Sequence, residues 1–333
     1  MNSTEDTAAR ALWYLAPGQA ELRDTTLGPL ASDHVRVRTL ASAISRGTEG
    51  LVFRGEVPES EIDRMRAPFQ AGDFPFPVKY GYAAVGRVEA GPAWCVKSRV
   101  FALHPHQDLF DVPADAAVAI PETVPSERAV LAANMETALN GIWDGGLSAG
   151  DKVAIVGGGV VGLLVAYLAA RTPGTEVTVL DINPARGPIA TAFGAAFGHP
   201  SEADGAYDLV FHTSASGVGF DTALRLADFE ATVVELSWYG TKPVLASLGG
   251  VFHSKRLTLR SSQVGAVAPS RRARWSTKRR LAKALDLLGD PALDRLLEPA
   301  IAFADSPERL GEVFSAERGM LCPLLRYPAA TDI

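Results

Sequence analysis

The sequence is poor in cysteine. Cys95 and Cys322 are the only two in 333 residues, so neither a disulfide framework nor a four-thiolate zinc site can be built. A chain without a disulfide framework fits a reducing compartment, and we expect a cytoplasmic protein. The first ten residues, MNSTEDTAAR, are polar and acidic, so we expect no signal peptide here.

Positive charge is not in excess. The chain has 32 Lys and Arg against 38 Asp and Glu, a net charge of -6. Nucleic acids are held chiefly by basic surface, so we expect no nucleic-acid partner and favour small-molecule chemistry. One basic run, RRARWSTKRR at 271–280, stands out. We interpret it as a solvated helix start rather than a nucleic-acid site. A docking surface for an acidic substrate is the remaining alternative.

Long hydrophobic runs are nearly absent. The stretch from Val153 to Ala170 carries no charge and reaches the lower limit of roughly 18 residues for a membrane span. Its order favours another structure: a β-branched run to Val156, three glycines, then good helix formers. The pattern predicts a strand, a glycine turn and a buried helix, and no membrane partner.

The rhythm of the chain changes near residue 122. Residues 11–121 suggest short β segments such as 34–40 and 99–103. From residue 125 a helical pattern at 126–143 precedes strands that alternate with helices; we expect these strands near 152–156, 176–180, 208–212, 232–236 and 257–261. Such alternation predicts a parallel sheet covered on both faces, an α/β fold. Later helices at 277–288 and 307–314 and a strand at 321–327 follow.

The segment KVAIVGGGVVG carries Gly157, Gly159 and Gly162 in G-x-G-x-x-G spacing. The first glycine permits a tight turn, the second lets a pyrophosphate approach the backbone, and the third packs helix on strand. Val160 and Val161 open the helix, whose N-terminus presents free N–H groups to phosphates. A glycine turn without a ligand is the less favoured alternative.

Asp181 ends the next strand, 24 residues after Gly157. An acid there accepts hydrogen bonds from the adenosine ribose and repels a 2′-phosphate, so NAD(H) is favoured over NADP(H). Arg186, just beyond it, can accommodate a phosphate, although we favour a solvated helix position for it.

Together with this turn, ASAISRGTEG at 41–50 and PVKYGYAAVGRVEAG at 77–91 resemble the medium-chain dehydrogenase/reductase (alcohol dehydrogenase-like) superfamily. The form ISRGTE also resembles the bacteriochlorophyllide dehydrogenase branch. The resemblance implies a β-rich, GroES-like substrate domain at 1–122 and 269–333 and a Rossmann NAD-binding domain, a doubly wound parallel sheet, at 123–268. It also implies a homodimer or homotetramer.

The positions that match the superfamily's catalytic zinc ligands hold Ser45, Tyr82, Ala83 and Ala133. Zinc needs thiolate, imidazole or carboxylate donors, so the resemblance implies a zinc-free member. The carbonyl or alkoxide would then be polarised by hydrogen bonds.

Five residues are candidates for that chemistry. Tyr82 replaces a zinc ligand, and its phenol can donate a proton; a packed aromatic is the alternative. Thr48 and Glu49 match the superfamily's proton relay and its neighbouring acid, with a helix-start threonine and a solvated acid as alternatives. Glu136 is a catalytic candidate or a first-turn dipole partner only.

His104 is the fifth candidate. With His106 it follows a strand at a spacing that points both rings to one face if the backbone stays extended. Two imidazoles could begin a metal site, but no third ligand is evident. A pocket histidine that donates a proton is favoured over a surface histidine.

Further cofactor contacts are implied by the resemblance. Thr137 would pack on the nicotinamide, and Thr213 and Ser214 would border the adenosine. Four further residues would border the nicotinamide: Ser237, Trp238, Ser262 and Gln263. Each of the six loop residues could equally be a turn residue.

The prediction is therefore a zinc-independent, NAD(H)-dependent oxidoreductase that transfers a hydride between nicotinamide and an alcohol or carbonyl substrate. Reduction of an activated C=C bond is the alternative among enzymes. A nucleotide-binding sensor or scaffold without turnover is the alternative of another class.

Overall fold

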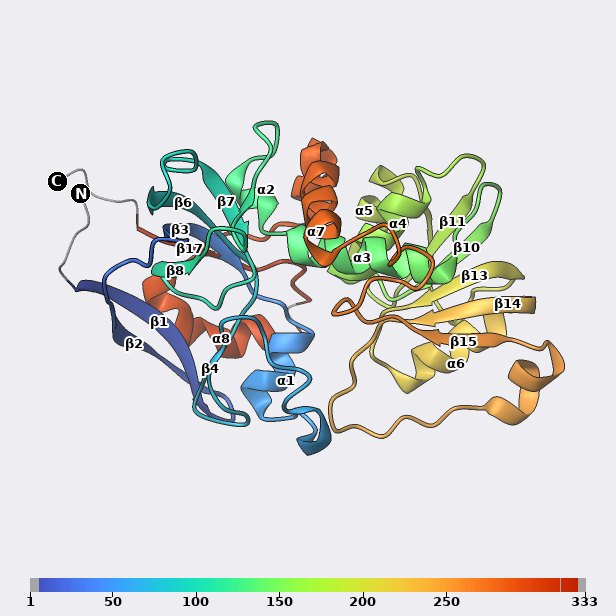
Figure 1. The fold of residues 1–333 in the computed structure, drawn as a ribbon. Coiled ribbons are helices and arrows are strands. Elements are labelled where there is room, and N and C mark those ends of the chain that lie inside the picture. The colour runs from blue at the N-terminus through green and yellow to red at the C-terminus, as the bar shows by residue number, and fades with distance from the viewer. Residues whose placement is uncertain (1–5, 318, 329–333) are drawn as a thin grey trace. The chain divides into compact units, whose positions relative to one another are not determined.

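The computed structural model describes residues 6–317 and 319–328. The chain divides into two compact units (Figure 1). Unit 1 comprises Met1–Ala133 and Leu285–Ile333, and unit 2 comprises Asn134–Ala284. The residues at 123–133 fall in unit 1, where the helix at Ser126–Ala129 contacts strands of that unit.

The strands of unit 1 pair mostly antiparallel, and β16 and β17 pair in parallel. One sheet has the order β2-β1-β5-β4, with bounds β1 Thr7–Ala16, β2 Gln19–Leu27, β4 Ala71–Gly72 and β5 Val78–Lys79. A second sheet has the order β16-β17-β3-β6-β7-β9, with β8 paired to β3. Its strands are β3 His34–Ala43, β6 Ala84–Ala90, β7 Arg99–Ala102, β8 Leu109–Pro113, β9 Val118–Ala119, β16 Ile301–Ala302 and β17 Leu324–Arg326.

Unit 1 also contains the helices α1 Thr48–Arg54, α2 Ser126–Ala129 and α8 Ser306–Phe314. Helix α8 begins with proline in its first turn and buries Leu310 and Val313, the spacing of one helix face. These residues join Tyr14, Phe53 and others in one core cluster.

Unit 2 contains the predicted parallel sheet, with strand order β12-β11-β10-β13-β14-β15. Its strands are β10 Lys152–Val156, β11 Glu176–Leu180, β12 Ala196–Gly198, β13 Tyr207–His212, β14 Ala227–Glu235 and β15 Thr258–Ser261. β10 lies inside the sheet and is buried from Val153 to Val156, which explains its unbroken apolar run. The order reverses beside β10, the switch point at which such sheets bind ligands.

Helices cover both faces of this sheet, and the predicted fold class is confirmed. α4 Val160–Ala169 and α5 Gly187–Ala192 lie on one side, and α6 Gly217–Leu226 lies on the other (Figure 1). The unit also contains most of α3 Ala132–Gly145 and of α7 Thr277–Asp286. Short helical turns elsewhere are η1 Glu59–Glu61, η2 Pro184–Arg186, η3 Leu248–Phe252, η4 Leu287–Gly289, η5 Pro291–Leu296 and η6 Phe303–Asp305.

The charge-free stretch from Val153 to Ala170 forms a strand, a glycine turn and a helix, as predicted. Among residues 6–317 and 319–328, no helix has the length and apolarity needed to cross a membrane. The helical pattern at 126–143 forms two helices, α2 and α3, instead of one.

Candidate functional site

The glycine turn links β10 to α4 within unit 2. Gly157 has φ of 114°, and a Cβ atom added there would lie 2.7 Å from the backbone nitrogen of Ser214. A Cβ atom on Gly162 would lie 2.0 Å from the carbonyl oxygen of Gly157. Neither position can hold a side chain without displacing backbone, which is the constraint predicted for the first and third glycines.

Gly159 differs because a Cβ atom there would meet nothing within 4 Å. It is the exposed N-cap residue of α4, and no side chain caps the helix. Val160 and Val161 are half-buried in the first turn. The space beside Gly159 at this helix start is therefore open, as the approach of a pyrophosphate requires.

Asp181 and Arg186 both lie at this turn. The carboxylate of Asp181 accepts hydrogen bonds from the backbone nitrogens of Gly158 (2.5 Å) and Asn183 (2.7 Å). A Cβ atom on Gly158 would lie 3.1 Å from Cγ of Arg186 and 3.2 Å from Cβ of Asp181. The acid and the base therefore flank the same stretch of backbone.

The loop after β13 contacts the turn directly. The hydroxyl of Thr213 donates to the carbonyl oxygen of Gly157 at 2.7 Å. Ser214 is exposed and hydrogen-bonds to His212. Sequence reasoning missed His212, Glu235 and Tyr239, which form one hydrogen-bonded cluster with Ser214. The available indication in the sequence was that His212 and Glu235 each end an apolar strand, and that these strands were expected to be neighbours.

The other residues implied by the resemblance have varied surroundings. Ser237 accepts from the backbone of Ala215 at 3.1 Å, and Trp238 is half-buried. Ser262 is buried and donates to Asp144 at 2.7 Å. Gln263 is exposed and accepts from Gly265, and Thr137 is half-buried in α3. Ser262 therefore serves the packing of unit 2 in this structure.

In unit 1, Tyr82 lies beside Ser45 and Thr48. Burial, followed by the carboxylate of Glu49, raises the pKa of Tyr82 to about 12, while hydrogen bonds with the Ser45 and Thr48 side chains oppose this rise. The ring of Tyr82 meets that of Tyr80 edge-on at 6.2 Å. The phenol is therefore neutral and able to donate a proton at neutral pH.

Glu49 is fully buried in α1, so it is not the solvated acid of the alternative interpretation. Its carboxylate accepts from Tyr14 Oη (3.0 Å) and the Ser45 backbone (2.7 Å), and it pairs with Nε2 of His106 at 2.9 Å. His106 is held in turn by Ser42 at 2.8 Å. Thr48 begins α1, so it is a helix-start threonine as well as a neighbour of Tyr82.

His104 lies between aromatic rings. It stacks on Phe110 at 3.9 Å and on Phe69 at 5.6 Å. Burial, followed by the charge of Lys79, lowers the pKa of His104 to about 3. An imidazole that stays neutral is a poor proton donor near neutral pH. His106 contacts a different set of residues, so the two rings do not share one environment.

Glu136 forms a buried ion pair with Arg280. Nε of Arg280 lies 2.9 Å from Oε1 of Glu136, and the guanidinium also donates to Asn140 and to two carbonyl groups. Arg280 is 1% exposed, which corrects the expectation that the whole basic run is a solvated helix start. The other cations of the run are exposed as expected: Arg271, Arg272, Arg274, Lys278 and Arg279.

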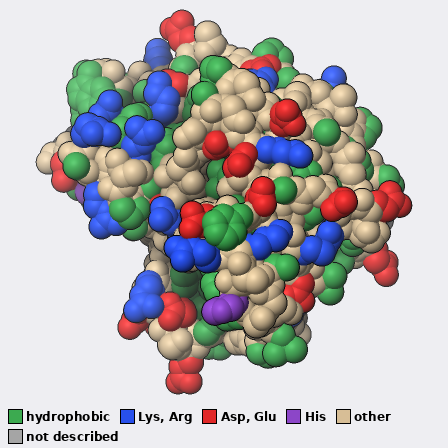
Figure 2. Space-filling view, turned by 90° about the vertical axis from the view of Figure 1, so that its right-hand side faces the viewer, with side chains coloured by type: hydrophobic (Ala, Val, Ile, Leu, Met, Phe, Trp, Pro, Cys, Tyr) green, Lys and Arg blue, Asp and Glu red, His purple; other side chains and the backbone are tan. Residues whose placement is uncertain are grey.

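Figure 2 presents one face of the molecule, on which several basic side chains lie together at the upper left and basic and acidic side chains are mixed elsewhere. Within the basic run, Trp275 packs against Trp143 at 4.8 Å, and the Arg279 guanidinium lies 4.0 Å from the Trp275 ring centroid. The tryptophan is thus half-buried within unit 2.

The residues present do not fit a catalytic zinc. Ser45 and Tyr82 are hydroxyl groups, and Ala83 and Ala133 carry no ligand atom. In the described part of the chain, no three His, Cys, Asp or Glu side chains are grouped so as to hold a metal ion. Burial, followed by the carboxylate of Glu298, raises the pKa of Cys322 to about 12.

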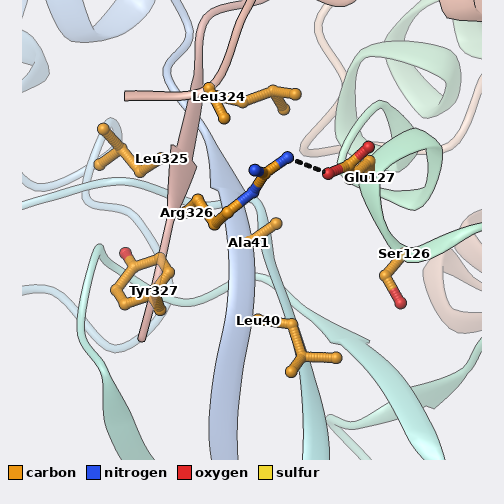
Figure 3. A pocket seen from close by; sticks show the side chains of 9 residues that line it. Leu40, Ala41, Ser126, Glu127, Leu324, Leu325, Arg326 and Tyr327 are labelled. Carbon is orange, nitrogen blue, oxygen red and sulfur yellow. Dashed lines mark hydrogen bonds and ion pairs between the residues drawn. The ribbon is translucent and has the colours of Figure 1, made fainter. Parts of the chain in front are cut away.

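A pocket of about 240 Å³ opens in unit 1 (Figure 3). Its lining is mostly apolar, and Arg326 reaches across to Glu127 at 2.5 Å. Tyr327 lines it and hydrogen-bonds to Ser42 at 2.9 Å. None of the predicted site residues lines this pocket.

Known proteins resemble this chain over most of its length. No protein-family model matches it. D-guloside 3-dehydrogenase of Escherichia coli K12 is 25% identical over 327 residues, covering 88% of this chain and 92% of that protein. L-idonate 5-dehydrogenase of E. coli superposes with a TM-score of 0.80 at 13% identity, covering 97% of this chain and 99% of that one.

2R,3R-butanediol dehydrogenase of Bacillus subtilis superposes with a TM-score of 0.77 at 16% identity, over 96% of this chain and 100% of that one. Two further structures with this fold were solved with NADH or with NADPH. The chain therefore has the fold of the alcohol dehydrogenase-like medium-chain dehydrogenases/reductases, and the fold that the resemblance implied is confirmed.

Proposed function

We propose that this chain is a zinc-independent oxidoreductase that uses NAD(H) and acts on an alcohol or carbonyl group of a sugar or polyol. The observation that carries the proposal is the glycine turn of unit 2. Backbone atoms fill the space beside Gly157 and Gly162, whereas the space beside Gly159 at the start of α4 is open. The sugar class is suggested by the D-guloside 3-dehydrogenase relative.

Residues of unit 2 would bind the cofactor. The start of α4 would bind the pyrophosphate, and Asp181 would accept hydrogen bonds from the adenosine ribose. The nicotinamide, when bound, supplies the hydride acceptor or donor. Asp181 carries the preference for NAD(H), because a carboxylate repels a 2′-phosphate; Arg186 beside it opposes that preference.

Tyr82 would handle the proton. Its phenol holds a proton at Oη, since its pKa is raised to about 12 by burial and by Glu49. It would donate that proton to a substrate oxygen during reduction and take it back during oxidation. Ser45 and Thr48 would orient the phenol through their hydrogen bonds. His104 is the second choice as proton donor, because its stacked ring stays neutral and so has no acidic proton to give near neutral pH.

The edge of the parallel sheet supports the proposed homodimer or homotetramer. β15 is the last strand of the sheet, and all four of its residues are exposed. An unpaired edge offers backbone N–H and C=O groups to another strand. Sedimentation of the purified protein, with Leu259→Glu as the disrupting variant, tests this assignment.

The test of function is a substrate panel followed by NADH absorbance, with and without a chelator. Glycosides and polyols are offered with NAD⁺, and aldehydes, ketones and enones with NADH. Turnover of a hydroxyl or carbonyl substrate that survives the chelator supports the proposal. Turnover of enones alone, or NADH binding without any turnover, overturns it.

Tyr82→Phe and Tyr80→Phe make a matched pair of variants. Both phenols lie in one segment, and that of Tyr80 donates to the carbonyl of Met65 at 3.4 Å. A positioned acid contributes at least about a hundredfold. Tyr82→Phe should therefore lower kcat by that factor with NADH affinity unchanged, and Tyr80→Phe should not. Equal activity of the two variants would remove Tyr82 from the chemistry.

A further inference from the structure

A hydrogen-bonded relay joins the carboxyl ends of β13 and β14 within unit 2. Nδ1 of His212 lies 2.7 Å from Oε2 of Glu235, and Nε2 lies 2.7 Å from Oγ of Ser214. His212 is fully buried, whereas Ser214 is exposed. The relay therefore runs from a partly buried carboxylate through a buried ring to a surface hydroxyl.

The carboxylate end of the relay is held in place. Glu235 accepts hydrogen bonds from the Ser237 backbone at 2.7 Å and from Tyr239 Oη at 3.0 Å. Burial opposes its ionisation, but the hydrogen bonds and charge of His212, together with Ser237, hold the pKa of Glu235 below its ordinary value. An ionised carboxylate can only accept, so Nδ1 of His212 carries the proton that it donates to Glu235.

This arrangement fixes the orientation of Ser214. Nε2 of His212, on the other side of the ring from Glu235, hydrogen-bonds the Ser214 hydroxyl at 2.7 Å. The Oγ atom is therefore held in one place on the surface. A hydroxyl held in this way is positioned to hydrogen-bond a sugar hydroxyl.

Ser214 also lies against the glycine turn. A Cβ atom on Gly157 would be 2.9 Å from the Cα atom of Ser214. We infer that Glu235 and His212 position Ser214 to hydrogen-bond a sugar hydroxyl of the bound dinucleotide. The inference rests on the proposed cofactor and adds two positioning residues, His212 and Glu235, behind the contact residue Ser214 that the resemblance implied.

Gly219 in α6 leaves the space through which the relay passes. A Cβ atom there would lie 2.2 Å from Oγ of Ser214 and 3.0 Å from Nε2 of His212. Gly219→Ala should therefore turn the Ser214 hydroxyl away from His212. Alanine is favoured over glycine in a helix, which offsets part of the cost of the hydrogen bond that His212 loses. The melting temperature of the variant measures the remaining change in stability.

The experiment measures the Kd of NADH by fluorescence titration on the full chain. The variants are Ser214→Ala, Gly219→Ala, His212→Phe and the double variant of Ser214 and His212. Loss of one neutral hydrogen bond should weaken NADH binding about 3- to 10-fold in each single variant. Residues that act as one unit are not additive, so the double variant should bind no more weakly than the weaker single.

Ser201→Ala is the matched control, because Ser201 Oγ lies 2.7 Å from Nδ1 of the exposed His199 without a carboxylate behind it. It should bind NADH as wild type does. Wild-type affinity in both Ser214→Ala and Gly219→Ala, or multiplicative losses in the double variant, would overturn the relay alone. Failure of wild type to bind NADH or NADPH would overturn both this inference and the proposed function.

Discussion

The buried pair of Glu136 and Arg280 permits a quantitative prediction. Arg280→Ala removes the partner 2.9 Å from the Glu136 carboxylate and the donors to the Val264 and Ala266 carbonyls. Removing one member of a buried ion pair costs about 3 to 5 kcal/mol, because the other charge stays buried. We expect the free energy of unfolding of Arg280→Ala to fall by about 4 kcal/mol.

The sign of the pH dependence follows from Glu136. Burial raises the pKa of Glu136 above its ordinary value, and Arg280 opposes that rise. A carboxyl group whose folded pKa is raised stabilises the fold below its unfolded pKa, and this stabilisation is lost as pH rises through the folded pKa. Without Arg280 the folded pKa rises further. The stability deficit of Arg280→Ala should therefore shrink as pH is lowered from neutral toward the ordinary pKa of glutamate.

Urea unfolding followed by tryptophan fluorescence measures this deficit, since Trp143 and Trp275 pack together in unit 2. The matched control is Arg279→Ala in the same helix. Arg279 is exposed over the Trp275 ring, so its loss should cost under about 1 kcal/mol. An Arg280→Ala deficit no larger than that of the control, or one independent of pH, would refute the reasoning.

Three other predictions concern the cofactor and the metal. Asp181→Ser should narrow the NADH-over-NADPH preference at least about tenfold in the ratio of Kd values; tighter NADPH binding by wild type would instead give Arg186 the deciding role. In Gly162→Ala the new methyl group would displace the Gly157 carbonyl from α4. The free energy of unfolding should fall by about 1 to 3 kcal/mol, and NADH should bind more weakly. Unchanged unfolding and binding curves would contradict the packing argument. Metal analysis should find no stoichiometric zinc, and one tightly bound zinc per chain would contradict the hydroxyl-based site.

Local patterns in the sequence predicted the parallel sheet closely. The expected strands at 152–156 and 176–180 match β10 and β11 residue for residue. A local cap also acts here, since Asn183 accepts from the Ala185 backbone at 3.0 Å and starts η2. Hydrophobic periodicity, caps and glycine turns act over a few residues, so one sequence is enough to read them.

Only the tertiary structure shows which side chains pair with one another. Glu136 meets Arg280 across 144 positions, Glu49 meets His106 across 57, and His212 meets Glu235 across 23. Arg280 stands in a run of cations that is otherwise exposed, and no local pattern marks it as the buried one. Burial and pairing depend on which distant segments the fold brings together, because a charged group leaves water only where a partner from elsewhere in the chain satisfies it.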